Sequence, residues 1–239
     1  MGSTRLPGKV LEPLAGRPAL VRIAERLAAV PALDGVAVVT SELERDDAIV
    51  ELCEREGIVV ARGSETDVLA RFHSAALAFR PRRVVRVTGD CPLVDPEVVS
   101  ALLALADASP DCAYASVATG AIPASRGVRR YPDGLDAEVF TVEALATAWA
   151  QATDPYEREH VTPYLWRRPD RFGARLLEPD VDMGSERWTI DHPADLTLVR
   201  ALYDKLGGHG RPFGLREILD ALEADPRLRE LNAAHRVAD

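Results

Sequence analysis

The sequence predicts an α/β fold with a mostly parallel, doubly wound sheet. Short β-branched runs alternate with amphipathic stretches through the first half of the chain, which is the pattern of repeated βα units. The 239 residues suit one domain, and neither an internal repeat nor a linker divides them. We therefore expect a single domain over residues 1–239, with one half at about 1–118 and the other at about 119–239.

Each element of the first half has a local signal. Residues 36–40 (VAVVT) form a β-branched run typical of a buried parallel strand. Gly57 is expected to end one helix, and Asp95 to cap another that begins with Pro96. The expected strands are 36–40, 58–61 and 84–87, and the expected helices are 19–30, 43–55, 65–79 (with Ser64 as N-cap) and 96–106.

The second half is less regular. Residues 120–134 are rich in Gly, Pro and Arg, so we expect a loop over the functional site. A helix is expected over 156–166 despite Pro163. The remaining expected strands are 113–117, 137–140, 174–177 and 187–190, and the remaining helices are 142–151, 193–206 and 215–223.

Charge and composition exclude several classes of protein. The formal net charge of −9 argues against a general nucleic-acid binder but leaves room for a small anionic substrate. No apolar run approaches the roughly 20 residues that span a bilayer, and Met1 is followed by a polar segment rather than a secretory leader. Cys53, Cys91 and Cys112 lack the spacing of a disulfide framework or a zinc site. We expect a cytoplasmic protein with neither a membrane nor a nucleic-acid partner.

The opening segment MGSTRLPGK (1–9) has the composition of a polyphosphate-binding loop. Glycines let the backbone approach a ligand, and successive N–H groups in such a turn can bind an anion. A planar guanidinium and a mobile ammonium add charge suited to phosphates. A tag-like terminus is the alternative interpretation. The candidate phosphate-binding residues are Gly2, Ser3, Thr4, Arg5, Gly8 and Lys9.

Two aspartates follow apolar runs that read as strands. Asp90 lies in RVTGDCPL (86–93) and Asp191 in RWTIDHPAD (187–195). Ligands of open α/β sheets bind at the carboxyl ends of strands, and a carboxylate there can hold Mg²⁺ on substrate phosphates. If the two strand ends lie side by side, both carboxylates could bind one metal ion. The alternative is that each aspartate only forms a turn or caps a helix.

Six segments in order over most of the chain form a specific pattern, although each is a weak signal alone. They are GSTRLPGKVLEPLAGRP (2–18), RGSETDVLARF (62–72), RVTGDCPLVDPEVV (86–99), YPDGLDAEVF (131–140), EREHVTPYL (157–165) and RWTIDHPADLTLVR (187–200). Together they resemble the acylneuraminate and CMP-Kdo cytidylyltransferase superfamily, and most of all its spore-coat-polysaccharide branch.

The resemblance implies a GT-A-like nucleotidyltransferase fold, a homodimer, and transfer of CMP from CTP to a sugar acid with release of pyrophosphate. It implies Arg5, Lys9, Asp90 and Asp191 as catalytic residues, the first two on the triphosphate and the aspartates on Mg²⁺. Arg62, Ser64 and Asp67 would join Gly89 and Asp90 in binding the nucleotide. The acceptor would meet Tyr131, Asp133, Asp136, Glu138, Glu159 and His160, for which ordinary surface polarity is the alternative.

One further hypothesis concerns the acid group of the acceptor. An arginine near the acceptor motifs could pair with that carboxylate, and the candidates are Arg126, Arg129, Arg130 and Arg158. His73, His209 and His235 lack any such context, and we interpret them as ordinary surface residues.

The chain departs from the family at its start. Relatives carry an apolar strand that ends in Gln-Ala-Arg or Pro-Ala-Arg directly before the position of Met1, and neither the strand nor that arginine is present. This strand is normally the first and central one, so its loss should cost core on both faces of the sheet. We expect Met1 to be an internal methionine, with the true start upstream by roughly one strand and a few residues.

Two other functions compete with the cytidylyltransferase. A GT-A glycosyltransferase would consume a nucleotide sugar and would use an acidic metal motif, but it would not need the triphosphate loop. A degenerate, inactive nucleotide-binding homologue is favoured only by the missing strand.

Overall fold

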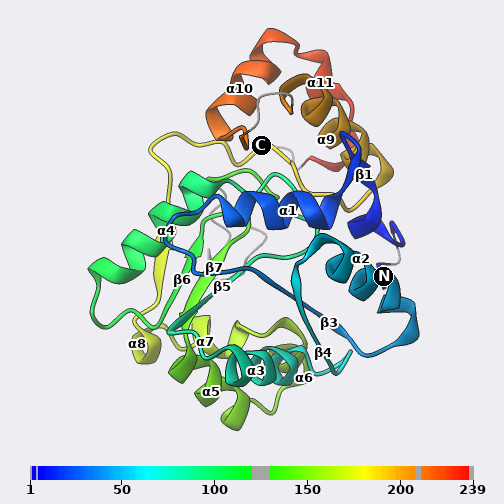
Figure 1. Cartoon of the computed structure of the whole chain (residues 1–239). Coiled ribbons are helices and arrows are strands. Elements are labelled where there is room, and N and C mark those ends of the chain that lie inside the picture. Colours follow the sequence, from blue (N-terminus) through cyan, green and yellow to red (C-terminus); the bar gives the residue numbers. More distant parts are fainter. Residues whose placement is uncertain (1, 4, 120–129, 208–210, 237–239) are drawn as a thin grey trace.

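The computed structural model describes residues 2–3, 5–119, 130–207 and 211–236. Strands form the middle of the molecule (Figure 1). Helices α1 (Ala19–Ala28) and α4 (Pro96–Ala108) cover one side, and α3 (Val68–Phe79), α5 (Val142–Gln151) and α6 (Pro155–His160) cover the other. Helices α9 (Pro193–Leu206), α10 (Leu215–Ala224) and α11 (Arg227–Glu230) gather at one end. Among the described residues, no helix is both long and apolar enough to cross a membrane.

The strands form a mixed arrangement rather than the mostly parallel sheet that the sequence predicts. β3 (Ala37–Ser41) pairs in parallel with β4 (Val59–Gly63). The larger sheet has the order β5-β7-β6-β8, in which β7 (Glu138–Thr141) runs antiparallel to both β5 (Arg83–Arg86) and β6 (Tyr114–Val117). Only β8 (Arg175–Leu177) is parallel to β6 there. Hydrophobic periodicity locates a strand but does not fix its direction, so the prediction was wrong on this point.

Most helices of the first half lie close to their predicted bounds. Gly57 adopts a φ of 69° at the end of α2 (Asp47–Glu56), and Asp95 accepts hydrogen bonds from the first turn of α4, which confirms both caps. The N-cap predicted at Ser64 is wrong. Asp67 caps α3 by accepting from the Ala70 N–H, while Ser64 accepts from the N–H of Asp67 one turn earlier. The first turn of the predicted 43–55 helix is instead a separate 3₁₀ turn, η2 (Glu44–Asp46).

Two predictions for the second half fail for local reasons. The helix expected over 156–166 breaks into α6 and α7 (Pro163–Trp166), with Val161 between them at a φ of 73°. Proline lacks an N–H and favours the first turn of a new helix. Residues 187–190 form no strand, because Trp188 donates to the Asp133 carbonyl and Ile190 to the Asp90 carbonyl, so no single ladder forms. The shorter elements are η1 (Lys9–Leu11), β1 (Pro13–Leu14), β2 (Arg17–Pro18), α8 (Pro169–Phe172) and η4 (Ala233–His235).

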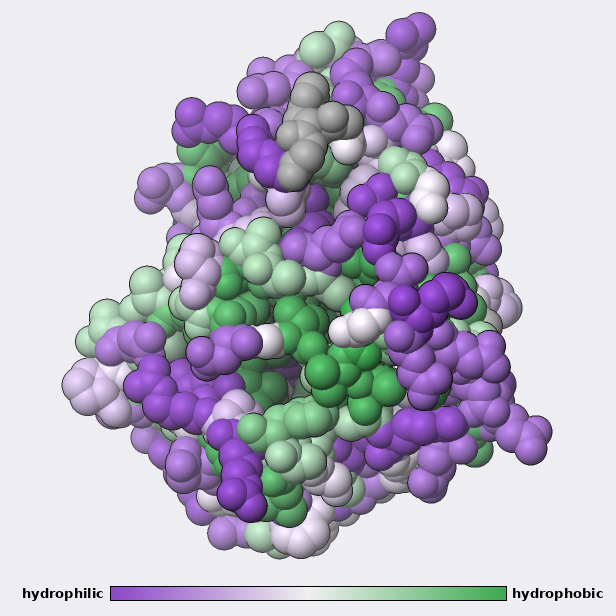
Figure 2. Space-filling view, viewed as in Figure 1, coloured by the Kyte–Doolittle hydropathy of each residue, from purple (hydrophilic) through white to green (hydrophobic). Residues whose placement is uncertain are grey.

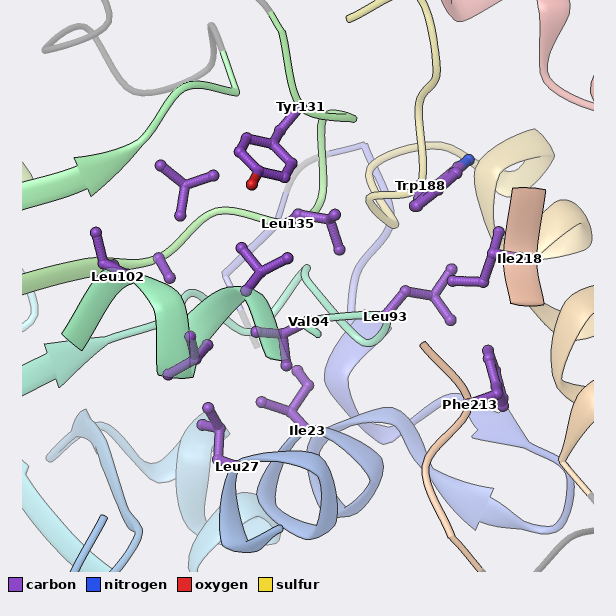
Figure 3. Packing of buried hydrophobic residues seen from close by; sticks show 14 of the residues in the cluster. Ile23, Leu27, Leu93, Val94, Leu102, Tyr131, Leu135, Trp188, Phe213 and Ile218 are labelled. Carbon is purple, nitrogen blue, oxygen red and sulfur yellow. The ribbon is translucent and has the colours of Figure 1, made fainter. Parts of the chain in front are cut away.

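The largest hydrophobic cluster joins the strands to the helices at both ends of the chain (Figure 3). Ile23 and Leu27 of α1 pack toward Leu93 and Val94, which follow β5. The cluster continues through Trp188, whose side chain is fully buried, to Ile218 of α10. The segments that carry Asp90 and Asp191 are thereby anchored in one core, which favours a precise placement of their carboxylates.

A cleft of about 750 Å³ lies between β3 and β5. Within the described residues, β3 pairs only with β4 and β5 only with β7, so each strand has one edge without a strand partner. Apolar side chains of α1 and α3, among them Leu20, Ile23 and Phe72, form its walls. The space-filling view shows a hollow with mainly hydrophobic walls on this face (Figure 2).

Candidate active site

Lys9 brings together the two aspartates that the sequence analysis singled out. Its ammonium nitrogen lies 2.9 Å from Oδ2 of Asp90 and 2.8 Å from Oδ1 of Asp191. Arg5 adds a second cation, with Nη2 3.0 Å from Oδ2 of Asp191. Four predicted residues from three distant segments therefore form one cluster of charges.

The opening loop has the turns that a phosphate loop needs. Ser3 accepts a hydrogen bond from the Leu6 N–H at 3.2 Å, and Gly8 adopts a left-handed φ of 72° before η1. Gly89 faces this loop, because a Cβ atom there would lie 2.9 Å from Cγ1 of Val10. Any larger residue would force the Val10 side chain to shift, so the close approach of these two segments favours glycine at this position. Thr4, which the sequence analysis also assigned to the loop, lies outside the described residues.

Backbone hydrogen bonds explain why Asp90 and Asp191 are neighbours. The carbonyl of Asp90 accepts from the Ile190 N–H at 2.9 Å and from the Thr189 hydroxyl at 3.0 Å. The alternative that Asp191 merely caps α9 is wrong, because His192 occupies the N-cap position. Asp90 caps no helix either, and its side chain accepts instead from Lys9 and Thr88.

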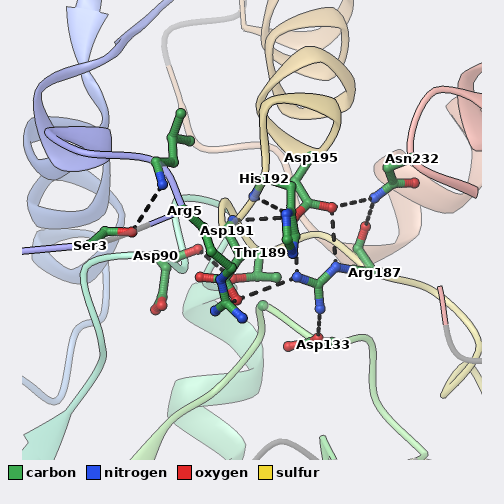
Figure 4. A network of polar contacts seen from close by, with 12 residues as sticks. Ser3, Arg5, Asp90, Asp133, Arg187, Thr189, Asp191, His192, Asp195 and Asn232 are labelled. Atoms are coloured by element: carbon green, nitrogen blue, oxygen red, sulfur yellow. Dashed lines mark hydrogen bonds and ion pairs between the residues drawn. The ribbon is translucent and has the colours of Figure 1, made fainter. Parts of the chain in front are cut away.

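Arg187 and Asp195 hold the Asp191 segment in place (Figure 4). Asp195 is fully buried and accepts from the backbone N–H groups of Asp191 and His192, at 3.2 and 3.0 Å. The Arg187 guanidinium donates to Asp195, to Asp191 and to Asp133. Asn232 donates its side-chain amide to both Asp195 and the Arg187 carbonyl. The segment after α11 therefore contributes to the frame of the site.

The charges within this cluster shift one another's pKa values. Burial disfavours the charged form of Lys9, but Asp90 and Asp191 outweigh burial, so the pKa of Lys9 is above its usual value. Burial would likewise raise the pKa of Asp191, but the hydrogen bond and charge of Lys9, with Arg5 and Arg187, lower it. Both groups are therefore charged at neutral pH.

A cavity of about 280 Å³ opens beside the aspartate pair. The predicted acceptor residues Asp133, Asp136, Glu138 and His160 line this cavity together with both aspartates. Tyr131 does not, because its ring is buried in the hydrophobic core near Leu135 (Figure 3). Glu159 is exposed on α6 and also lies outside the cavity lining. The other lining residues are Arg86, Thr88, Tyr156, Thr162, Pro163, Trp166 and Thr189.

Within the described part of the chain, the hydrogen-bond partners of Asp136 are all neutral groups. It accepts from the Thr119 hydroxyl at 2.6 Å and from the Gly134 N–H at 2.9 Å, and the Cys91 thiol lies 3.7 Å away. Burial, followed by the charge of Asp133, raises the pKa of Asp136 to about 6. Its carboxyl group can thus change protonation state near neutral pH.

The residues predicted to bind the base and ribose make structural contacts. Arg62 donates to the carbonyls of Ser41 and Leu43, which ties β4 to the loop after β3. Asp67 pairs with Arg158 of α6, where Nε lies 3.1 Å from both carboxylate oxygens. These contacts fix the loop that holds the two residues, and their role toward a nucleotide stays a prediction.

Comparison with known proteins decides the family. The cytidylyltransferase family model matches residues 1–207. This chain belongs to the cytidylyltransferase family. It is 33% identical over 235 residues to the spore coat polysaccharide biosynthesis protein SpsF of Bacillus subtilis, covering 95% of this chain and 92% of that protein. It is 31% identical over 235 residues to the 3-deoxy-manno-octulosonate cytidylyltransferase of Anaeromyxobacter dehalogenans, covering 84% and 93%.

A solved structure agrees with this assignment. The fold is similar to that of a cytidylyltransferase from Leptospira borgpetersenii, with a TM-score of 0.86 and 28% identity over 95% of this chain and 92% of the other. The α/β nucleotidyltransferase fold is confirmed, and so is the expected membership of the cytidylyltransferase superfamily. The chain is therefore a nucleotidyltransferase enzyme.

Several residues of this cytidylyltransferase site were missed by the sequence analysis. Arg187, Asp195 and Asn232 form the frame around Asp191, and Arg86 and Trp166 line the cavity. Arg187 and Asp195 lie in the segment RWTIDHPAD (187–195), but nothing in their spacing marks them as site residues. Asn232 lies in a segment without any motif, so no sequence signal pointed to it.

The arginines proposed for the acceptor carboxylate are placed elsewhere where the structure describes them. Arg158 is held by Asp67 and by the carbonyl of Trp149, and Arg130 lies 3.6 Å from Glu178. Neither lines the 280 Å³ cavity. Arg126 and Arg129 lie outside the described residues, as does His209. Of the other two histidines interpreted as surface residues, His73 stacks on Trp149 and His235 on His192.

Proposed function

We propose that this cytidylyltransferase transfers CMP from CTP to a sugar acid or a related acceptor, with release of pyrophosphate, in surface polysaccharide or glycoconjugate biosynthesis. The observation that carries the proposal is the cluster of Lys9 with Asp90 and Asp191, because both aspartates also line the 280 Å³ cavity. A phosphate-binding loop and an acceptor cavity then meet at one pair of carboxylates. The names of the SpsF and 3-deoxy-manno-octulosonate relatives support the choice of pathway and acceptor class.

The residues of the cluster suggest how the reaction proceeds. Arg5 and Lys9 bind the triphosphate, and an acceptor oxygen attacks the α-phosphorus in line while pyrophosphate leaves. Negative charge develops on the bridging and leaving oxygens, and the two cations neutralise it. The cavity positions the acceptor, which removes the entropic cost of bringing two substrates together in water. No cysteine need act, and the buried Cys91 thiol, whose pKa burial raises well above its usual value, is a poor nucleophile.

Asp90 and Asp191 suit a magnesium ion. Oxygen atoms of both carboxylates lie within 2.9 Å of one ammonium nitrogen, so both can reach a common cation. Mg²⁺ is usually held by one or two carboxylates together with substrate phosphates and water. Bound there, Mg²⁺ would supply charge neutralisation on the triphosphate.

The test is pyrophosphate release from CTP, with and without Mg²⁺, in the presence of a panel of sugar acids. We expect release that requires both an acceptor and Mg²⁺, with CTP preferred over the other nucleotides. Consumption of a nucleotide sugar instead would support the glycosyltransferase alternative, which the family match already disfavours. Mg²⁺-dependent CTP binding with no turnover of any acceptor would support an inactive homologue.

We also propose that the GT-A-like sheet is completed by one apolar strand in the cleft between β3 and β5. Unpaired backbone groups at two facing strand edges are costly in apolar surroundings, and one inserted strand would pair with both. The position of Gly2 indicates in which direction this strand would run. A Cβ atom on Gly2 would lie 3.2 Å from the side chain of Arg45, which comes just after β3. A strand parallel to β3 and β5 would thus end where the phosphate loop begins.

An extended protein tests this completion. A six-residue apolar segment placed directly before Met1 should slow amide hydrogen exchange in β3 and β5, because both edges gain partners. The matched control carries prolines at alternate positions of the same segment, which removes the donors for one edge. Equal exchange in the two proteins would contradict the proposal.

The homodimer that the resemblance implies is a further proposal. It rests on the resemblance to the cytidylyltransferase family, to which the chain belongs. Sedimentation velocity over a hundredfold range of concentration measures the mass directly. A mass near twice 26.0 kDa is expected, and a single species of 26.0 kDa throughout would contradict it.

A further inference from the structure

Arg86 is the one Arg or Lys residue that lines the 280 Å³ cavity within the described part of the chain. Its neighbours in the lining include five carboxylates, those of Asp90, Asp133, Asp136, Glu138 and Asp191. An acidic ligand that enters such a cavity must find a cation, because like charges in a confined site repel strongly. Arg86 is therefore where an acid group can be bound.

Most of the other charges near the cavity are already paired. Lys9 contacts Asp90 and Asp191, and Arg187 contacts Asp133. Arg86 uses Nη1 for Glu138, at 2.5 Å from Oε2. Its Nε–H and Nη2–H groups have no partner among the described residues, and the side chain is 18% exposed. The guanidinium thus keeps donors for a ligand after it has neutralised Glu138.

Glu138 holds Arg86 in a fixed place. The two residues lie opposite each other in the β5–β7 register. Glu138 is almost fully buried, and its other oxygen accepts from the hydroxyls of Tyr114 and Thr162, each at 2.7 Å. The guanidinium also lies over the ring of Phe72, 5.9 Å from its centre. A planar fork held in this way suits a carboxylate, which binds two parallel donors.

We propose that Arg86 binds the carboxylate of the acceptor and so selects acids over neutral sugars, with Glu138 as its positioning residue. The proposal rests on the proposed function, because it names the group that reads the substrate class of the same cavity. Arg86 and the aspartate pair line the same cavity, so one small acceptor can present its acid group to Arg86 and its reacting oxygen to the aspartate pair. None of the arginines suggested by the sequence supplies this contact among the described residues.

The experiment compares an acid with its neutral analogue. The probes are 3-deoxy-manno-octulosonate and its C1 amide, and the readouts are pyrophosphate release and calorimetric binding. The wild-type protein should prefer the acid by roughly 10- to 100-fold, the range of a charge-assisted bidentate contact. Arg86→Gln should remove this preference by raising the KM for the acid while leaving the KM for CTP unchanged, and Arg86→Lys should retain part of it. Arg82→Gln, an exposed arginine just before β5, is the control and should behave as the wild type.

A double variant excludes a purely structural role. Removing Arg86 leaves Glu138 buried and unpaired, which could by itself disturb the site. Arg86→Gln with Glu138→Gln removes both charges and keeps groups that can hydrogen-bond to Tyr114 and Thr162. We expect the double variant to fold and bind CTP but still to lack the acid preference. Recovery of the preference in the double variant would overturn the proposal.

The remaining outcomes separate this proposal from the function on which it rests. A wild-type protein that binds the acid more tightly than the amide but releases no pyrophosphate would contradict the proposed function and support Arg86. Pyrophosphate release at equal rates from acid and amide would contradict Arg86 and support the function. Failure to bind the acid at all contradicts the role of Arg86.

Discussion

Lys9 and Asp191, 182 positions apart in the sequence, are joined by a hydrogen bond of 2.8 Å from ammonium to carboxylate. The same ammonium contacts Asp90, so one lysine holds two carboxylates that would otherwise repel each other. In the proposed reaction, Asp90 and Asp191 would hold Mg²⁺, and Lys9 would neutralise charge on the triphosphate. The contact therefore links the structure of the site to its proposed chemistry.

Replacement of Lys9 tests this link. Lys9→Met should lower kcat/KM by roughly 10²- to 10³-fold, the effect of removing one group that neutralises developing charge. The secondary structure of this variant by circular dichroism should be unchanged, because the hydrogen bond from the Ile190 N–H to the Asp90 carbonyl holds the two aspartate segments together without Lys9. Lys205→Met, an exposed lysine at the end of α9, serves as the control. A Lys9 variant with wild-type kcat/KM would refute the assignment.

Asp195 should matter for stability more than for direct chemistry. It is fully buried and compensates Arg187 while accepting two backbone N–H groups. Asp195→Asn leaves Arg187 with less compensation, which should lower the free energy of unfolding by about 3 kcal/mol. Urea denaturation measures the loss. Asp204→Asn, at an exposed position of the same helix, should change it by less than about 0.5 kcal/mol, and equal losses in the two variants would argue against this role.

The raised pKa of Asp136 predicts that the wild-type protein and an Asp136→Asn variant differ in stability by an amount that depends on pH. Its pKa is about 6 in the folded protein against an ordinary value of 3.8, so the folded state binds a proton that the unfolded chain has lost. The stability it contributes is fully present below pH 3.8 and is lost as the pH rises through about 6. Asp136→Asn keeps an acceptor for Thr119 and removes the charge.

The variant should therefore equal the wild type near pH 4 and exceed it by on the order of 2 kcal/mol at pH 7.5. The measurement is the free energy of unfolding across this range in a metal-free buffer. A difference between the two proteins that does not vary with pH would show that Asp136 keeps an ordinary pKa. The proteins should also differ in activity, since Asp136 lines the acceptor cavity.

The sequence predicted the positions of most strands and helices because their signals are local. Hydrophobic spacing, Gly57 and the Asp95–Pro96 pair each act within one turn or one strand. Strand direction depends on how distant segments pack, so the antiparallel placement of β7 was not predicted. The same limit explains why the strand expected over 187–190 does not form. The backbone of these residues divides its hydrogen bonds between Asp90 and Asp133.

The candidate site was predictable where function imposes a residue type at a fixed place in a motif. Lys9, Asp90 and Asp191 meet as the resemblance implies. Tyr131 belongs to the same motif as Asp133, but its side chain packs in the hydrophobic core. A motif therefore also contains residues that only support the fold, and the sequence does not separate the two kinds. Arg86 and Asn232 act through contacts with distant chain segments, and only the three-dimensional arrangement reveals those partners.

Gly134 shows how closely residues 131–137 and the Asp191 segment approach each other. It adopts a φ of 106°, and a Cβ atom there would lie 2.4 Å from the Thr189 backbone nitrogen. Gly134→Ala should therefore cost about 3 kcal/mol or more in the free energy of unfolding, because neither strain nor clash can relax without moving backbone. It should also lower activity by displacing Asp133 from Arg187.

Gly35→Ala is the matched control for this substitution. Gly35 has no heavy atom within 4 Å of its added Cβ, and its φ is not in the left-handed range. This variant should be as stable as the wild type or slightly more so, since alanine restricts the unfolded chain. If Gly134→Ala were tolerated as well as Gly35→Ala in thermal unfolding, residues 131–137 could not pack against Thr189 as described, and the cavity beside the aspartate pair would have a different wall.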